Sequence, residues 1–184
     1  MALNKNEKLD LEKQVIHFMS DCTECYKDYV DIVSIARKKG FSVQRLNMGD
    51  NTTGMMLCDD NFFIAGTTTQ RLIVVKKGLT EEQSRFIVAH ELGHFAFKPT
   101  EKHRISHREY SSLRTNKEEQ KADYFASALL MPKDQIIELI KKSGRQQSSE
   151  RDIVLKISKD FKVSEAKAYN RLCDIKQLFS EEVI

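Results

Sequence analysis

The spacing of apolar residues along the chain predicts helices at both ends and short strands between them. Two N-terminal stretches, 11–19 and 29–39, repeat apolar side chains every three or four residues, as one face of a helix does. Short apolar runs bounded by Gly, Asn and Asp come next and predict strands. These strands are expected over 41–46, 54–58, 62–65 and 71–76. This part of the chain is therefore expected to form a small, mostly antiparallel sheet of three to four strands packed on helices.

The second half of the chain is expected to be helical apart from one irregular segment. Residues 98–117 carry many charges and little apolar periodicity, whereas 118–131 repeat apolar residues with helical spacing. The remainder, 133–184, has helical spacing too, and Ser164 is a suitable N-cap between its last two helices. We therefore expect an α+β domain over 1–132, followed by a helical tail with a helix-turn-helix-like segment.

The composition indicates a cytoplasmic protein without a membrane segment. Of the 184 residues, 31% are charged, and no apolar run is long enough to span a bilayer. The first ten residues mix both charge signs and lack an apolar core, so we expect no secretion signal. The net charge of +3 is too small to indicate nucleic acid as a partner on its own.

Four cysteines fit a reduced cytosolic chain better than a disulfide framework. Cys22 and Cys25 form a C-x-x-C motif, which could bind zinc or carry out redox chemistry. The motif has no second C-x-x-C, no nearby histidine pair and no βαβ pattern around it. Ordinary thiols are the preferred interpretation, also for Cys58 and Cys173.

The strongest chemical signal is an H-E-x-x-H motif formed by His90, Glu91 and His94. Residues four apart lie on one helix face, so both imidazoles can reach one metal ion, and Glu91 can take a proton from the attacking water. Thr80 and Gln83 read as a capping box that starts this helix. Apolar residues flank the motif on both sides, so its polar groups would be costly to bury without a metal. The alternative is a surface helix that carries these residues on its solvent side.

A catalytic zinc ion commonly has three protein ligands, so the two histidines need a third partner. The predicted helix over 118–131 offers two adjacent candidates, Glu118 and Glu119, which point about 100° apart on a helix. We prefer Glu119, because Asp123 lies one turn further along the same face and can orient a ligating histidine. Glu118 fits the solvent-facing acidic start of a helix.

These two segments resemble a known family. Residues 86–97 around His-Glu-Leu-Gly-His, followed by Glu-Gln-Lys-Ala-Asp-Tyr-Phe-Ala-Ser-Ala-Leu-Leu-Met-Pro at 119–132, are similar to the ImmA/IrrE family of metallopeptidases. The resemblance extends over 30–132. Members of that family are carried by bacteria, phages and conjugative elements, and several cleave a helix-turn-helix repressor encoded beside them to derepress silenced genes.

The resemblance implies a cytoplasmic, zinc-dependent, site-specific endopeptidase with a zincin-like active-site helix. Zn²⁺ would be held by His90, His94 and Glu119. Glu91 would be the general base, and Asp123 would hold a histidine in place. A transcriptional repressor is the expected protein substrate.

Two features of the reaction stay open at this level. A substrate strand could add antiparallel to an edge strand formed by 71–76. The group that stabilises the oxyanion could be His103, His107, Tyr110 or Tyr124.

A second hypothesis gives the chain a regulatory role without proteolysis. Its tail would bind DNA or a repressor, and its metal site would be structural or vestigial. A recognition helix in the tail would offer Lys167, Asn170 and Arg171 to DNA, yet basic residues barely outnumber acidic ones from 133 onward. The presence of every motif residue favours the peptidase, and the sequence does not indicate an oligomeric state.

Overall fold

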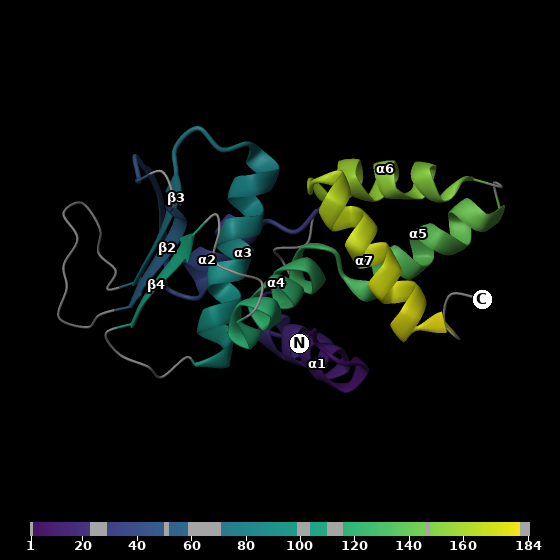
Figure 1. The fold of residues 1–184 in the computed structure, drawn as a ribbon, viewed down its shortest axis with the longest axis horizontal. Helices are drawn as coiled ribbons and strands as arrows, with labels where there is room; N and C mark the ends of the chain where they lie inside the picture. Colours follow the sequence, from purple (N-terminus) through teal and green to yellow (C-terminus); the bar gives the residue numbers. More distant parts are fainter. Residues whose placement is uncertain are drawn as a thin grey trace.

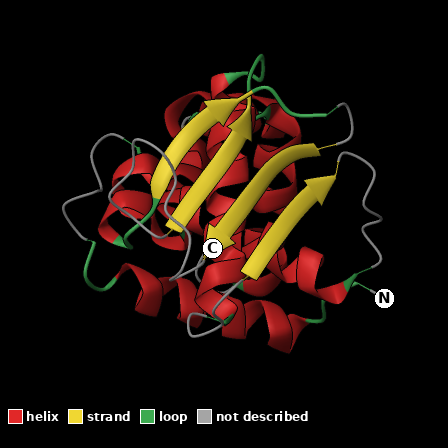
Figure 2. Cartoon of the chain, turned by 90° about the vertical axis from the view of Figure 1, so that its left-hand side faces the viewer, coloured by secondary structure: helices red, strands yellow, loops and turns green. Residues whose placement is uncertain are grey.

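A four-stranded sheet lies against a layer of helices, and three further helices extend from that layer (Figures 1 and 2). The computed structural model describes residues 2–22, 29–49, 52–58, 71–98, 104–109, 116–145 and 148–180. The strands are β1 (Ser42–Leu46), β2 (Thr52–Cys58), β3 (Arg71–Lys76) and β4 (Arg104–Glu109). The helices are α1 (Lys5–Met19), α2 (Ile32–Lys38), α3 (Glu81–Phe97), α4 (Lys117–Leu130), α5 (Lys133–Arg145), α6 (Glu150–Phe161) and α7 (Glu165–Leu178). The predicted α+β class with a helical C-terminal region is confirmed.

The strand order in the sheet is β1-β3-β2-β4. β2 pairs antiparallel with both β3 and β4, and β1 pairs parallel with β3, so the sheet is mostly antiparallel as predicted. The expectation that 71–76 forms an edge strand is wrong. β1 pairs with the side of β3 that a simple β2–β3 hairpin would leave open. The four consecutive apolar residues 72–75 of β3 are all buried. Within the described sheet, β1 and β4 are the edge strands.

β4 is a second correction, because the whole segment 98–117 was expected to be irregular. Its sequence, Arg-Ile-Ser-His-Arg-Glu, has no apolar run that would indicate a strand. An edge strand can be held by backbone hydrogen bonds to a single neighbour, and charged side chains are common on such edges. The predicted strand over 62–65 lies outside the described residues.

Local capping sets where several helices begin. The predicted capping box between Thr80 and Gln83 starts α3. A second capping box, between Asn4 and Glu7, starts α1 six residues before the predicted beginning at 11. Asp31 caps α2, which therefore begins later than the predicted 29. No described helix is both long enough and apolar enough to cross a membrane.

α3 is the central helix of the fold, and all its residues from Ser84 to His94 are buried. It packs against β2 and β3 on the sheet side and against α2 and α4 on the others (Figure 1). Two glycines allow these close contacts. A Cβ at Gly54 on β2 would lie 2.3 Å from the Ile87 Cγ2 atom, and one at Gly93 would lie 3.3 Å from the Ala122 Cα atom on α4.

A buried ion pair connects the C-terminal helix α7 to the N-terminal helix α1. Arg171 on α7 is fully buried and donates hydrogen bonds to both carboxylate oxygens of Glu12 on α1. Its Nε also donates to the Met131 carbonyl oxygen at the end of α4, at 3.0 Å. The expectation that Arg171 faces DNA is therefore wrong, because the guanidinium group is enclosed by the core. The proposed division of the chain at residue 132 stays a prediction.

Replacing Gly54 with alanine tests the contact between β2 and α3. Gly54→Ala is expected to lower the free energy of unfolding by about 1–3 kcal/mol, because the added Cβ overlaps the Ile87 side chain. Urea denaturation measures this change. Gly49→Ala is the matched control, since a Cβ there meets no atom within 4 Å. The Gly54→Ala loss should shrink in an Ile87→Ala background, and equal stability of the two glycine variants would contradict the argument.

Removing Glu12 tests the ion pair that holds α7. Glu12→Ala is expected to cost about 3–5 kcal/mol of unfolding free energy, because it leaves the Arg171 charge buried without its carboxylate. Adding Arg171→Met should recover much of this loss. The control, Glu138→Ala, breaks an exposed pair with Lys142 and should leave the urea midpoint nearly unchanged. A midpoint for Glu12→Ala close to that of the control would show that the pair does not hold the tail.

Candidate metal centre

Two imidazoles and one carboxylate meet between α3 and α4. The Nε2 atoms of His90 and His94 lie 3.1 Å apart. Glu119 places one carboxylate oxygen 3.1 Å from His90 Nε2 and the other 3.0 Å from His94 Nε2. Both histidines are buried, while the Glu119 side chain keeps 24% of its surface exposed. The structure thus brings together the three residues that the sequence predicted as metal ligands.

The donor set fits a zinc ion. Imidazole nitrogen and carboxylate oxygen are both zinc ligands, and tetrahedral zinc with bonds of about 2.0–2.1 Å holds its ligand atoms about 3.3 Å apart. The two Nε2 atoms are 3.1 Å apart, and each lies 3.0–3.1 Å from a different oxygen of Glu119. One ligand atom from each of the three residues lies within 4.8 Å of the others, which is compact enough for a shared metal ion. Close contacts of its oxygens with the imidazole of His90 and, to a smaller extent, with that of His94 hold the pKa of Glu119 well below its usual range, so this carboxylate is ionised at neutral pH.

Asp123, one turn after Glu119 on α4, contacts the far side of His90. Its Oδ1 atom lies 2.9 Å from His90 Nδ1. An imidazole that donates its Nδ1–H to a carboxylate keeps the lone pair on Nε2, the nitrogen that faces Glu119. The aspartate therefore suits a role in fixing both the ring orientation and the tautomer of His90.

Glu91 is fully buried on α3 beside strand β2. A Cβ at Gly54 would lie only 3.5 Å from the Glu91 Oε1 atom, so the missing side chain lets the strand pass close to the carboxylate. β2 is also irregular at this point, because its register against β4 shifts between Thr52 and Gly54. The sequence placed Gly54 at the start of a predicted strand and not at the site, although a glycine in a strand pattern often marks a close backbone approach.

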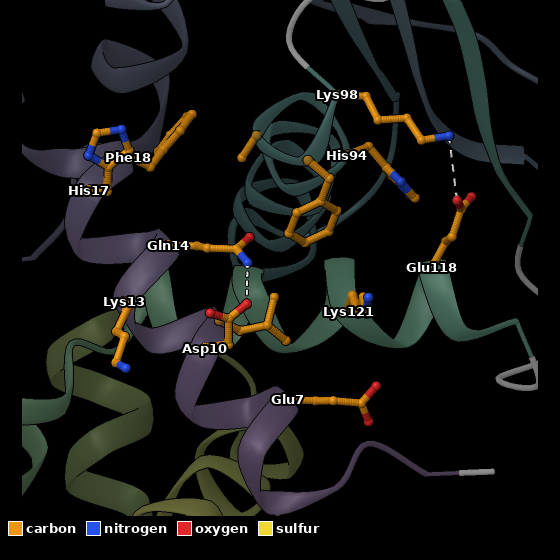
Figure 3. Close-up of a pocket in the computed structure, with 13 residues that line it drawn as sticks. Glu7, Asp10, Lys13, Gln14, His17, Phe18, His94, Lys98, Glu118 and Lys121 are labelled. Atoms are coloured by element: carbon orange, nitrogen blue, oxygen red, sulfur yellow. Dashed lines mark hydrogen bonds and ion pairs between the residues drawn. The ribbon is translucent and has the colours of Figure 1, made fainter.

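Glu118 lies elsewhere. Its side chain is 59% exposed and pairs with Lys98 at 3.5 Å (Figure 3). Only Glu119 of the two neighbours contacts the histidines, and the helical rotation between adjacent residues explains the difference. The geometry therefore favours Glu119 as the third ligand.

The four candidates for oxyanion stabilisation have different outcomes. The Tyr124 hydroxyl donates a 2.7 Å hydrogen bond to Glu12, the partner of Arg171, and is therefore not free for this role. Burial raises the pKa of Tyr124 far above its usual value, which agrees with an enclosed phenol. His107 belongs to β4, where its backbone is paired with Met55 of β2. His103 and Tyr110 lie outside the described residues, as does Cys25 of the C-x-x-C motif.

A pocket of about 750 Å³ adjoins His94 (Figure 3). It lies between α1, the end of α3 and the beginning of α4. Side chains of both charge signs line it, among them Glu7, Asp10, Lys13, His17, Lys98 and Lys121. The pocket provides room for part of a ligand next to the histidine cluster.

Comparison with known protein families finds a match. The family model Peptidase_M78, described as an IrrE N-terminal-like domain, matches residues 36–173. This range is well over half of the chain and contains all of the residues that form the histidine–carboxylate cluster. It also reaches into α7, beyond the predicted boundary at residue 132. A search of curated proteins finds no match.

The adjacent glutamates allow a matched test of the ligand assignment. Glu119→Ala should lose the bound metal, because it removes the oxygen atoms that contact both histidines. Glu118→Ala should retain it, because only an exposed pair with Lys98 is lost. Metal content after dialysis, measured by mass spectrometry, checks both. Metal loss from Glu118→Ala and retention by Glu119→Ala would show that the wrong glutamate was chosen.

Proposed function

The protein belongs to the IrrE N-terminal-like (Peptidase_M78) family, and from this we propose that it is a zinc-dependent endopeptidase that cleaves a specific protein substrate. The observation that carries the proposal is the convergence of His90, His94 and Glu119, with Glu91 adjacent to the first histidine on the same helix. A zinc ion bound by these three side chains would polarise the scissile carbonyl and activate a water molecule.

In this proposal the chain's own residues orient the reacting groups and move the proton. Asp123 accepts the Nδ1–H of His90, which leaves Nε2 available as a ligand. Glu91 acts as the general base: it takes a proton from the attacking water and passes it to the leaving amine. Its burial against β2 keeps bulk water away from the carboxylate.

The edge of β4 is the proposed place for the substrate backbone. β4 pairs with β2, and β2 runs beside Glu91, so an extended peptide added to β4 would continue the sheet near the metal centre. The sequence had suggested β3 (71–76) as the strand to which the substrate adds. β3 is paired on both sides, so β4 takes its place in the proposal. The pocket beside His94 would accommodate a neighbouring part of the substrate.

We further propose a helix-turn-helix transcriptional repressor as the substrate, on the strength of the family resemblance. Such a substrate would place the reaction in the cytoplasm. The alternative hypothesis of a DNA-binding regulator has less support, because Arg171 is buried and Lys167 pairs with Asp123. Of the three residues expected to face DNA, Asn170 alone is exposed.

Glu91→Gln separates catalysis from metal binding. The variant should keep the metal and the fold, because the amide has nearly the same shape as the carboxylate. It should cleave a co-expressed repressor from the neighbouring gene about 10²- to 10⁴-fold more slowly, because it lacks the general base. Gel and mass-spectrometric analysis of the repressor measures cleavage, with Glu82→Gln on the first turn of α3 as the control. Wild-type cleavage by a folded, metal-loaded Glu91→Gln protein would overturn the mechanism.

A further inference from the structure

Lys167, on the C-terminal helix α7, lies next to the metal centre. Its Nζ atom is 3.3 Å from Oδ2 of Asp123, whose Oδ1 lies 2.9 Å from His90 Nδ1. We propose that Lys167 is a positioning residue of the metal centre, which holds the Asp123 carboxylate against His90. The proposal rests on the proposed zinc site and adds a residue from the tail to it.

Lys167 restricts the rotation of the Asp123 side chain. About one third (34%) of the aspartate side chain is exposed, so solvent could draw the carboxylate away from the histidine. An ammonium group on Oδ2 favours the one rotamer in which Oδ1 faces His90 Nδ1. The lysine thus acts on His90 through the aspartate.

Lys167 is itself held by both helices that carry the donors. Its Nζ atom lies 3.7 Å from the centre of the Phe86 ring on α3, within the range of a cation–π contact. Phe86 precedes His90 by four residues and so lies on the same helix face. One turn after Lys167, Arg171 anchors α7 to Glu12 and to the Met131 carbonyl group. These contacts leave the ammonium group little room to move.

Local helix chemistry does not account for a lysine at this position. Lys167 is the third residue of α7 after the N-cap Ser164, and positive charge in a first turn opposes the helix dipole. At the equivalent position α1, α3 and α6 carry Glu7, Gln83 and Asp152, each of which completes a capping box. The tertiary contact with Asp123 supplies the reason that the local sequence lacks.

The test measures zinc affinity of the full chain by competition with a chromogenic chelator. Lys167→Met keeps an unbranched side chain but removes the charge, and with it the pair with Asp123 and the cation–π contact with Phe86. It should weaken zinc binding about threefold, less than the 10- to 100-fold typical for a direct partner of a ligating histidine. Lys167→Arg should restore most of the affinity. The control is Lys176→Met, which removes another cation of α7, one that pairs at the surface with Glu150 of α6; it should bind zinc as the wild type does.

Three further measurements distinguish positioning from helix stability. In an Asp123→Asn background, Lys167→Met should have almost no additional effect, because the carboxylate it holds is absent. Lys167→Glu would complete a capping box with Ser164 and so stabilise α7 locally, yet it should weaken zinc binding more than Lys167→Met does. Nitrogen NMR of His90 in the metal-free protein gives an independent readout, since Lys167→Met should increase the minor tautomer.

The outcomes separate this inference from the proposed function. If the wild type shows no zinc binding that depends on Glu119, the proposed metal centre fails and the inference fails with it. If the wild type binds zinc but Lys167→Met has wild-type affinity, only the role of Lys167 is overturned. The same conclusion follows if the loss persists unchanged in the Asp123→Asn background.

Discussion

The arrangement depends on how closely α3 approaches the elements on either side of it. Gly93 lies inside the helix, where glycine costs about 1 kcal/mol relative to alanine, yet a Cβ there would meet the Ala122 backbone at 3.3 Å. On the sheet side, the missing Cβ of Gly54 likewise lets β2 lie close to Ile87 of α3. Because α4 can lie so near to α3, the Glu119 carboxylate comes within hydrogen-bonding distance of two buried imidazoles.

The C-terminal helices are part of this arrangement. Burying the Arg171 charge would cost several kcal/mol without a partner, and the bidentate contact with Glu12 offsets that cost. Since the partner lies on α1 and the Met131 carbonyl group ends α4, the pair fixes α7 relative to both helices. Lys167, the cation that pairs with Asp123, is therefore held on a fixed helix. A displacement of α7 would move this ammonium group and so change the contact between Asp123 and His90.

Much of the fold could be predicted because its signals are local. The capping box at Thr80 and Gln83 and the N-cap at Ser164 involve residues three apart, so the sequence alone locates the beginnings of α3 and α7. β4 was not predicted, because its position is determined by backbone pairing with β2, and this pairing requires no particular side-chain pattern. The inner position of β3 could not be read either, since it depends on which strand β1 joins.

The sequence by itself determined the chemistry of the candidate site: a helix that presents His90, Glu91 and His94, and a second helix with Glu119 and Asp123 one turn apart. Helical periodicity is enough to relate residues within each helix. The sequence favoured Glu119 over Glu118, and tertiary structure showed Glu119 beside the histidines and Glu118 paired with Lys98. Only tertiary structure decided that Lys167 pairs with Asp123 and that Arg171 is buried against Glu12. Those contacts join residues far apart in the chain, and their geometry follows from packing between helices, which no local pattern encodes.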